Sequence, residues 1–344
     1  MSQSQSRWFY PDRHADRRPF LLARNRIIAS VREWFAAHDF IEVECGALQM
    51  SPGNEAHLHG FATELIQPDG TAERRYLHTS PEFACKKLLA AGETRIFDIA
   101  RVYRNRERTH THSPEFTMLE WYRAHEDYKA VIGDTLALVR LAAETADTKI
   151  FQWRGREAAP FAECEWLSVN DAFLRYAGVD LLATLGINGE ADRDALAAIS
   201  PVRVAEDDSW SDIFSRILSE EVEANLGNGR ITVLYEYPAV EAALARACER
   251  DPRVAERFEL YACGVELANG FGELTDASEQ RRRFEAEMDV KEKAYGERYP
   301  IDEELLEALA MMPPASGVAL GLDRLIMLAV GATRIDQVRW TPAE

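Results

Sequence analysis

The sequence predicts an α+β fold built on a mostly antiparallel sheet flanked by helices. Strand-like runs, either alternating or continuously apolar, lie toward both ends of the chain, and an alanine-rich block with helical periodicity at about 127–250 separates them. Strand runs that enclose a block of helices are typical of α+β proteins. The 344 residues, 47% of them hydrophobic, suffice for one large domain with a full core.

The N-terminal part is predicted to begin with a flexible lead-in at residues 1–19, because this stretch is polar. The apolar positions of 20–35 have helical spacing, and a second helix follows Ser80, with Ser80 as N-cap, Pro81 in the first turn and Gly92 just past its end. The other predicted elements are strands at 40–44, 76–79, 95–103 and 116–124 and a loop at 51–61.

The C-terminal part is predicted to continue the sheet after the helical block. A strand at 231–238 ends at a proline, and 257–274 reads as a hairpin. A charged helix runs from Asp276 to about Tyr295. The segment 316–331, SGVALGLDRLIMLAVG, reads as a short strand that leads directly into an apolar helix.

Composition excludes several function classes. The net charge of −18 disfavours general binding to nucleic acid, although a local cationic pocket for a small phosphate ligand remains compatible with it. No apolar run reaches the roughly 18–20 residues of a membrane helix, and the N-terminus lacks a signal-peptide pattern. The five cysteines are scattered, as in reduced proteins. These features favour a cytoplasmic protein.

The stretch YRNRERTHTHSPEFTMLEWY (103–122) places a cationic loop between two strands. Three arginines, one glutamate and two histidines lie within its first ten residues. Arginine offers planar, bidentate donors that match a phosphate, and Phe116 on the returning strand can stack a purine. From these residues alone, a solvated hairpin tip is an equally good interpretation.

Two further stretches carry candidate ligands. In FELYACGVELANGFGEL a two-residue Cys263-Gly264 turn would place Glu259 and Glu266 on one sheet face, where a Mg²⁺ ion could join them; two exposed strand acids are the alternative. In SGVALGLDRLIML the glycines permit close approach of a ligand, and Arg324 lies at the start of a helix.

In this order the three stretches resemble the catalytic core of class II lysyl-tRNA synthetases. Residues 26–48, 103–122 and 317–331 correspond to motifs 1, 2 and 3, and the resemblance extends from about Phe20 to the end. Only about 20 residues precede the first core helix, so no anticodon-binding domain is expected. SPEF, HSPEFTMLEWYR and GVELANGFGELTDASEQ resemble the short paralogues of this class, the elongation factor P–(R)-β-lysine ligases.

The resemblance implies a function and its partners. A carboxylate, of (R)-β-lysine or more weakly of α-lysine, would attack the α-phosphorus of ATP in the presence of Mg²⁺. The acyl-adenylate would then pass its acyl group to a lysine of elongation factor P. A homodimer formed through motif 1 is expected, whereas tRNA and membranes are not expected as partners.

The resemblance also assigns site residues. Arg104 and Arg324 would be catalytic, because they hold the triphosphate and the attacking carboxylate. The residues expected to bind ATP are Arg104, Asn105, Arg106, His112, Ser113, Phe116, Glu266, Leu267, Gly321 and Arg324. The expected metal ligands are Glu259 and Glu266. The amino-acid pocket would contain Ser80, Pro81, Glu82, Glu120, Tyr122, Asn269, Glu273 and Ala319.

Several positions depart from the family pattern. Motif 2 normally reads Arg-x-Glu, but here Arg106 stands third and the acid is Glu107; either the loop shifts register or the main chain reads the adenine. Gly46 replaces the usual motif 1 proline, and Ser113 replaces a more common asparagine. Ala319 replaces a glycine of lysyl-tRNA synthetases, and its methyl group would favour a β-amino acid.

Three other functions are compatible with parts of the pattern. A truncated synthetase that charges tRNA would need a basic surface, and an ammonia-dependent asparagine synthetase would need basic residues in its amino-acid pocket. A non-catalytic regulatory paralogue would have lost the phosphate and metal ligands. The sequence keeps Arg104, Glu259, Glu266 and Arg324, and its expected pocket is lined by acids. These features favour the ligase.

Overall fold

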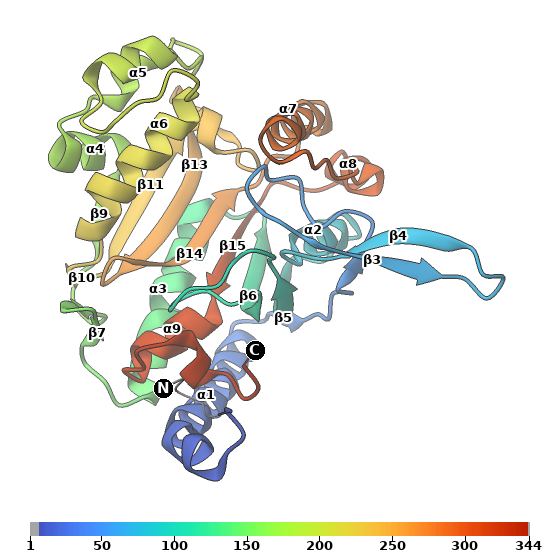
Figure 1. The fold of residues 1–344 in the computed structure, drawn as a ribbon, viewed down its shortest axis with the longest axis vertical. Helices are drawn as coiled ribbons and strands as arrows, with labels where there is room; N and C mark the ends of the chain where they lie inside the picture. The colour runs from blue at the N-terminus through green and yellow to red at the C-terminus, as the bar shows by residue number, and fades with distance from the viewer. Residues whose placement is uncertain (1–6, 343–344) are drawn as a thin grey trace, which may run out of the picture.

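The fold is organised around one nine-stranded sheet in a computed structural model that describes residues 7–342 (Figure 1). Its strands are, in sheet order, β1 (Ile41–Glu42), β5 (Arg95–Tyr103), β6 (Glu115–Ala124), β15 (Ala315–Gly321), β14 (Val265–Gly272), β13 (Asp251–Ala262), β11 (Thr232–Pro238) and β9 (Glu165–Ser168), with β12 (Ala247–Cys248) paired to β13. The pairs β1–β5 and β11–β9 are parallel, and the others are antiparallel. The predicted α+β class is confirmed.

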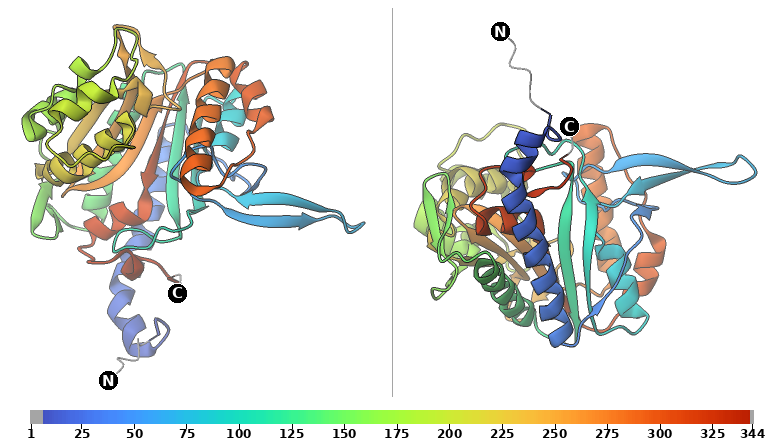
Figure 2. Two further views of the ribbon diagram at one scale, coloured as in Figure 1. Left: turned by 45° about the horizontal axis from the view of Figure 1, so that its top comes forward. Right: turned by 90° about the horizontal axis from the view of Figure 1, so that it is seen from below.

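One face of this sheet is closed by three helices. They are α1 (Pro11–Ala37), α3 (Tyr128–Thr145) and α9 (Leu322–Ala329), and α1 runs along the strands in the right view of Figure 2. Phe35 of α1 stacks on Phe97 of β5 with ring centroids 4.3 Å apart, and both rings belong to the main core with Trp121 of β6. Burial of these aromatic side chains fixes which face of β5 and β6 remains for the site.

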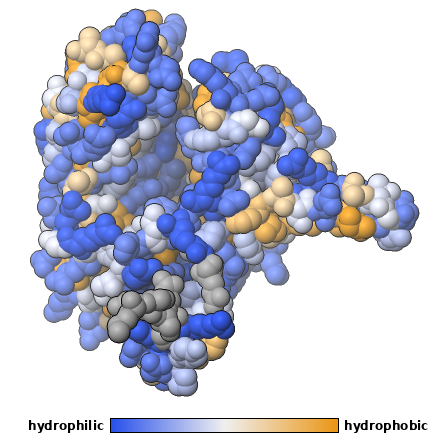
Figure 3. All heavy atoms as spheres, in the orientation of Figure 1, coloured by the Kyte–Doolittle hydropathy of each residue, from blue (hydrophilic) through white to orange (hydrophobic). Residues whose placement is uncertain are grey.

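The opposite face is covered only at its two ends. One group of helices consists of α2 (Glu82–Ala90), α7 (Ala277–Tyr295) and α8 (Glu303–Leu309), and the other of α4 (Val169–Ala177), α5 (Arg193–Ile199) and α6 (Trp210–Ile217). Each group has its own apolar cluster. The space-filling view is hollowed between the two groups (Figure 3), above the middle strands. This arrangement leaves the centre of the sheet open to a ligand.

Two small sheets complete the structure. Strands β7 (Phe151–Trp153), β8 (Arg156–Ala159) and β10 (Gly229–Arg230) form one of them. Strands β2 (Leu48–Gln49), β3 (Phe61–Ile66) and β4 (Ala72–Leu77) form the other, and the β3–β4 hairpin projects from the body of the molecule (Figure 1). The hairpin and strands β7–β9 were not predicted, because they are short and only partly buried; of the predicted strand at 76–79, only residues 76 and 77 lie in β4.

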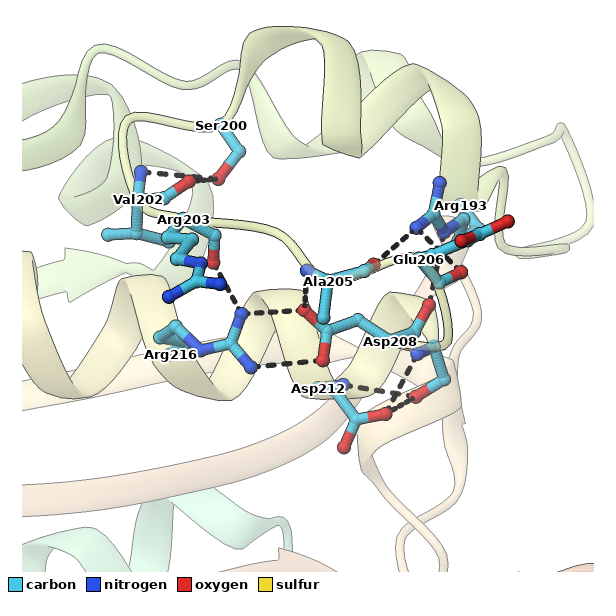
Figure 4. Close-up of polar contacts among 10 residues, drawn as sticks. Arg193, Ser200, Val202, Arg203, Ala205, Glu206, Asp208, Asp212 and Arg216 are labelled. Atoms are coloured by element: carbon cyan, nitrogen blue, oxygen red, sulfur yellow. Dashed lines mark hydrogen bonds and ion pairs between the residues drawn. The ribbon is translucent and has the colours of Figure 1, made fainter.

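The connection between α5 and α6 is held by an ion cluster near the surface (Figure 4). Arg216 donates to both carboxylate oxygens of Asp208, at 2.6 and 3.0 Å, and Asp208 Oδ2 also accepts the main-chain N–H of Ala205. Ser209 and Asp212 cap each other at the start of α6. These hydrogen bonds hold the loop in addition to the apolar contacts of Val202 and Val204 with the neighbouring helices.

Several element boundaries differ from the prediction. Helix α1 begins at Pro11, so residues 11–19 of the expected lead-in are helical. Proline is favoured in the first turn of a helix, and the acid Asp12 stabilises the same turn. Residues 1–6 of the expected lead-in lie outside the described residues. Only two residues of the expected strand 40–44 pair with the sheet, at its edge. Within residues 7–342, none of the helices has the length and apolar character that a membrane crossing requires.

Candidate active site

A row of facing residues crosses the open face of the sheet. Glu120 of β6 lies opposite Ala319 of β15, Ala319 opposite Asn269 of β14, and Asn269 opposite Glu259 of β13. Residues that face each other on adjacent strands project from the same side of a sheet. Two expected pocket residues, one expected metal ligand and the residue expected to discriminate isomers therefore lie side by side.

The hairpin that connects β13 and β14 determines which side chains enter this row. Cys263 and Gly264 both have positive φ, as the predicted two-residue turn requires, and Glu259 and Glu266 share a face as expected. The register shifts beyond Tyr261, which pairs with Glu266, and Leu267 becomes the extra residue of a bulge. Without that shift Ala268, and not Asn269, would face Glu259.

The floor of the expected amino-acid pocket is a buried acid held by two hydroxyl groups. Ser80 Oγ donates to Glu120 Oε1 at 2.6 Å, and Tyr122 OH donates to Oε2 at 2.8 Å. Ser80 Oγ also accepts the main-chain N–H of Glu82 at 3.0 Å; α2 itself begins at Glu82, later than predicted. Burial, together with the charge of Glu82, raises the pKa of Glu120 to about 8.

A lysine joins the other two acids of the pocket. Lys86 Nζ lies 2.6 Å from Glu82 Oε1 and 2.7 Å from Glu273 Oε2, and the side chain of Lys86 is 1% exposed. Burial raises the pKa of Glu273 to about 7, although the positive charge of Lys86 acts in the opposite direction. Among the described residues, none donates a hydrogen bond to Glu273 Oε1. The pocket thus contains buried acids in excess of its buried cations.

Beside the pocket lie the expected ATP ligands. The guanidinium of Arg104 lies 5.4 Å from the ring centroid of Phe116. Arg324 Nη1 is 3.7 Å from Glu266 Oε2, and Arg324 Nη2 is 2.7 Å from His112 Nε2. Burial and the charges of Arg324 and Arg104 lower the pKa of His112 to about 4, so the imidazole is neutral at pH 7. The site therefore combines cationic, aromatic and acidic parts.

The comparisons with known proteins decide the family. The chain matches the family described as tRNA synthetases class II (D, K and N) over residues 2–344. The chain belongs to the class II tRNA synthetase family. Similar proteins include three that are each named "Elongation factor P--(R)-beta-lysine ligase". The protein of Haemophilus ducreyi is 40% identical, and the match covers 92% of both chains. The proteins of Haemophilus influenzae strain PittGG and of Edwardsiella ictaluri are 41% and 40% identical, and each match covers 92% of this chain and 93% of the relative. These relatives confirm the resemblance to the short paralogues.

In the motif 2 loop, Arg106 stands where the family pattern has an acid, and the acid Glu107 follows it. Arg106 has a φ of 66° and turns to Glu297, at 2.6 Å from Nη2 to Oε1, away from the side chains that line the nucleotide end of the cleft. Glu107 lines a cavity there with His112, Ser113, Phe116, Gly321 and Arg324. This position of Glu107 is compatible with a loop shifted in register by one residue.

Three other expected nucleotide ligands of the class II core have their side chains engaged elsewhere. Leu267 is buried in the main core, so it can reach the cleft only through its main chain. Ser113 is buried, and Arg339 donates to its hydroxyl. Asn105 is exposed; its side chain accepts the N–H of Arg106, and its own N–H binds the carbonyl of His59 at 2.7 Å.

The acids expected to bind metal fit the preferences of Mg²⁺ in part. Glu259 accepts hydrogen bonds from Arg257 Nη2 and Tyr261 OH, both at 2.6 Å, which leaves one lone pair on each carboxylate oxygen. Burial and the charge of Glu259 raise the pKa of Glu266 to about 7, while its 41% exposure lets solvent screen part of this repulsion. Within residues 7–342, no group of three or more His, Cys, Asp or Glu side chains could hold a metal. Phosphate oxygens would have to supply the other ligands.

Sequence reasoning missed two charged residues of the site. Lys86 lies in the predicted helix after Ser80, and its position four residues after Glu82 is a signal for an ion pair within that helix. Arg257 was not selected, yet it binds Glu259 and donates from Nε to Asn269 Oδ1 at 3.3 Å. The sequence signal for Arg257 was its spacing of two residues from Glu259, because residues i and i+2 of a strand project from the same sheet face.

Proposed function

We propose that the chain is an ATP-dependent ligase that activates (R)-β-lysine, and α-lysine more weakly, and transfers it to a lysine of elongation factor P. The observation that carries the proposal is the cluster of buried acids beside two arginines on one open sheet face. An amino acid with two ammonium groups matches the acids, and a triphosphate matches the arginines. The similar proteins are named for the same reaction, which supports the proposal.

In the first step, the amino-acid carboxylate attacks the α-phosphorus of ATP. The new bond joins carboxylate oxygen to phosphorus, the bond to the bridging oxygen breaks, and pyrophosphate leaves with its electron pair. Arg104 lies between the acid pocket and Phe116, so it is placed to hold both the carboxylate and the α-phosphate. Arg324 is placed to hold the outer phosphates. Positioning and charge neutralisation supply most of the catalysis in such reactions.

The adenine end of the site is formed by residues of motifs 2 and 3. Phe116 offers its ring as a stacking surface, and neutral His112 can donate or accept a hydrogen bond. Glu107 takes the place that the family pattern gives to the acid for the adenine amine. Gly321 and the main chain of Leu267 complete this part of the proposed site.

Mg²⁺ is part of the proposal. When bound, it would neutralise the charge that the phosphates bring to the cleft. Glu266 and Glu259 would hold it, since their mutual repulsion is relieved by a cation. Arg257 keeps the Glu259 carboxylate in place, and Arg324 faces Glu266 from the other side.

The acid pocket is proposed to hold the two ammonium groups of the substrate. Glu120, Tyr122 and Ser80 would receive one of them, and Glu273 with Asn269 the other. Ala319 lies directly between Glu120 and Asn269 in the row, so its methyl group limits the space at the amino-bearing carbon. We expect (R)-β-lysine to be adenylated faster than α-lysine, and equal rates for the two isomers would contradict the role of Ala319.

In the second step, the amine of the acceptor lysine attacks the acyl carbon. A C–N bond forms, the bond between the acyl carbon and the phosphate oxygen breaks, AMP leaves, and the amine loses a proton to solvent. We propose that the acceptor protein reaches the site through the open side of the cleft, between the two helical groups (Figure 3). Because the acceptor is a translation factor, the enzyme would work in the cytoplasm.

Mass spectrometry tests this function directly. Elongation factor P is incubated with the enzyme, ATP, Mg²⁺ and (R)-β-lysine, and we expect its mass to increase by one lysyl group on one lysine. A reaction without ATP is the control. Acylation of tRNA without a mass change of elongation factor P would favour the truncated synthetase, and no activation of any amino acid would favour a regulatory paralogue.

A homodimer formed through the motif 1 region is also proposed. Large apolar side chains near the sheet edge at β1 and the base of the β3–β4 hairpin are exposed: Ile41, Leu48 and Met50. Orange atoms mark this apolar surface at the base of the hairpin in Figure 3. Light scattering is expected to give twice the mass of the chain, and Ile41→Glu is expected to lower it to that of one chain.

A further inference from the structure

Lys86 is a buried cation that the proposed reaction does not use. It lies on α2 in contact with Glu82 of the same helix and Glu273, which follows β14, so it joins two walls of the pocket. The ammonium holds Oε1 of Glu82 and Oε2 of Glu273. Lys86 does not contact the other oxygen of either carboxylate, which is Oε2 of Glu82 and Oε1 of Glu273.

The orientation of Glu273 follows from this contact. A Cβ atom on Gly317, which faces Tyr122 in the sheet, would come within 2.5 Å of Glu273 Oε1. Oε1 therefore points at the floor of the pocket, next to Tyr122, while Lys86 holds Oε2 behind it. Among the described residues none donates a hydrogen bond to this buried Oε1 atom, so an ammonium group of a ligand would supply the donor that it lacks.

The charges of the pocket give Lys86 a second effect. When ionised, Glu82, Glu120 and Glu273 carry three negative charges, and Lys86 reduces the total to two. Two is the number of ammonium groups on a diamino acid. An additional unpaired carboxylate would be costly to bury and would favour protonation of the acids.

We propose that Lys86 is a positioning residue that orients Glu82 and Glu273 and matches the charge of the pocket to a diammonium substrate. This inference rests on the proposed function and specifies how that site selects a diamino acid. Lys86 itself does not touch the reacting atoms. The other titratable groups that face the three carboxylates are Cys85, Tyr122, Arg104, Arg246 and Glu55.

The test measures ATP–pyrophosphate exchange with (R)-β-lysine from pH 6 to 9 for the wild type and for Lys86→Met. The carboxylate form binds ammonium, so KM falls as the pH rises through the pKa of the pocket acids. Without Lys86 these acids ionise at higher pH. We expect KM for (R)-β-lysine at pH 7 to rise at least about tenfold and the midpoint of its pH dependence to move upward, with KM for ATP within about twofold of the wild type.

Lys87→Met is the matched control. Lys87 is the next residue of α2, but its ammonium pairs with Asp302 at 2.8 Å, outside the pocket. We expect its midpoint to equal that of the wild type. A merely structural role for Lys86 would lower Tm and kcat but leave the midpoint unchanged, and that result would overturn the inference.

A second pair of variants covers the case in which Lys86→Met does not fold. Glu82→Gln keeps Lys86, whereas Glu82→Gln/Lys86→Met removes both partners of the helical ion pair and leaves no unpaired charge within it. We expect a higher midpoint for the double variant, and equal midpoints would overturn the inference. Absence of exchange in the wild type would overturn the proposed function and this inference with it, whereas exchange with equal midpoints affects the inference alone.

Discussion

The helical block at about 127–250, called the insertion below, and the pocket on the open sheet face each contain an ion cluster, and the two clusters are built differently. In the insertion, both oxygens of Asp208 are bound by Arg216 and one also accepts the N–H of Ala205, which lowers the pKa of Asp208 to about 2 (Figure 4). In the pocket, burial raises the pKa of Glu120 to about 8. Carboxylic acids in the two clusters thus titrate at very different pH.

Two physical factors cause this difference. The cluster around Asp208 lies near solvent and pairs its charges one to one, so the folded state favours the ionised acid. The acids of the pocket are buried and outnumber its buried cations, so the folded state favours protonated acids until a cation binds. A balanced cluster holds its own loop together, whereas an unbalanced buried one is typical of a binding site.

The strongest test of the comparison is Glu120→Gln. Glutamine resembles the protonated acid, so the protein should fold, but it cannot become anionic when an ammonium group binds. We expect kcat/KM for (R)-β-lysine in pyrophosphate exchange to fall about 100-fold or more, as for loss of one partner of a buried charge pair. Glu64→Gln on the exposed hairpin strand β3 is the control and should match the wild type. A decrease below threefold in Glu120→Gln would contradict the role of the buried acid.

A second test changes the shape of the pocket without changing its charge. In Gly317→Ala the new methyl group would lie 2.3 Å from a ring carbon of Tyr122 and 2.5 Å from Glu273 Oε1, so the acid must move. We expect KM for (R)-β-lysine to rise at least about tenfold while KM for ATP stays constant. Gly133→Ala is the matched control, because no heavy atom lies within 4 Å of its new Cβ. Equal KM values for the two variants would refute the placement of Glu273.

The pH dependence of stability separates the two clusters in the unmodified protein. The pKa values of Glu120 and Glu273 are about 8 and about 7 in the folded state, compared with about 4.3 for an unfolded glutamate. The folded state therefore binds more protons than the unfolded state, and these two groups lower the stability of the fold as pH rises from about 4 to 8. Added (R)-β-lysine should therefore raise Tm more at pH 8 than at pH 6, as differential scanning fluorimetry can measure. An equal shift at both pH values would be incompatible with proton release from the pocket.

The smallest effect is expected from the surface cluster. Asp208 has a lowered pKa, so its contribution to stability is complete above about pH 4 and is lost only as pH falls toward 2. Arg216→Met should lower Tm by a few degrees at most and leave modification of elongation factor P unchanged. Thermal melts and the mass-spectrometric assay check both statements. A threefold loss of activity would show that the insertion acts on the site.

The sequence alone determined the features that depend on neighbouring residues. Strand-like apolar runs predicted β5, β6 and β11. The Cys263-Gly264 turn together with the period of two placed Glu259 and Glu266 on one face, because turn chemistry and side-chain alternation are local. The order of the three motifs predicted the family. The helix after Ser80 was also anticipated, to within two residues at its start.

Tertiary structure decided the contacts between residues that are distant in the chain. The bulge at Leu267 placed Asn269 opposite Glu259, and the packing of α2 brought Lys86 to Glu273. The turn at Arg106 left Glu107 to line the cavity beside Phe116. No periodicity of one segment encodes such a pairing, because its free energy depends on burial and on which charges other segments supply. The charge balance of the pocket is therefore a property of the fold.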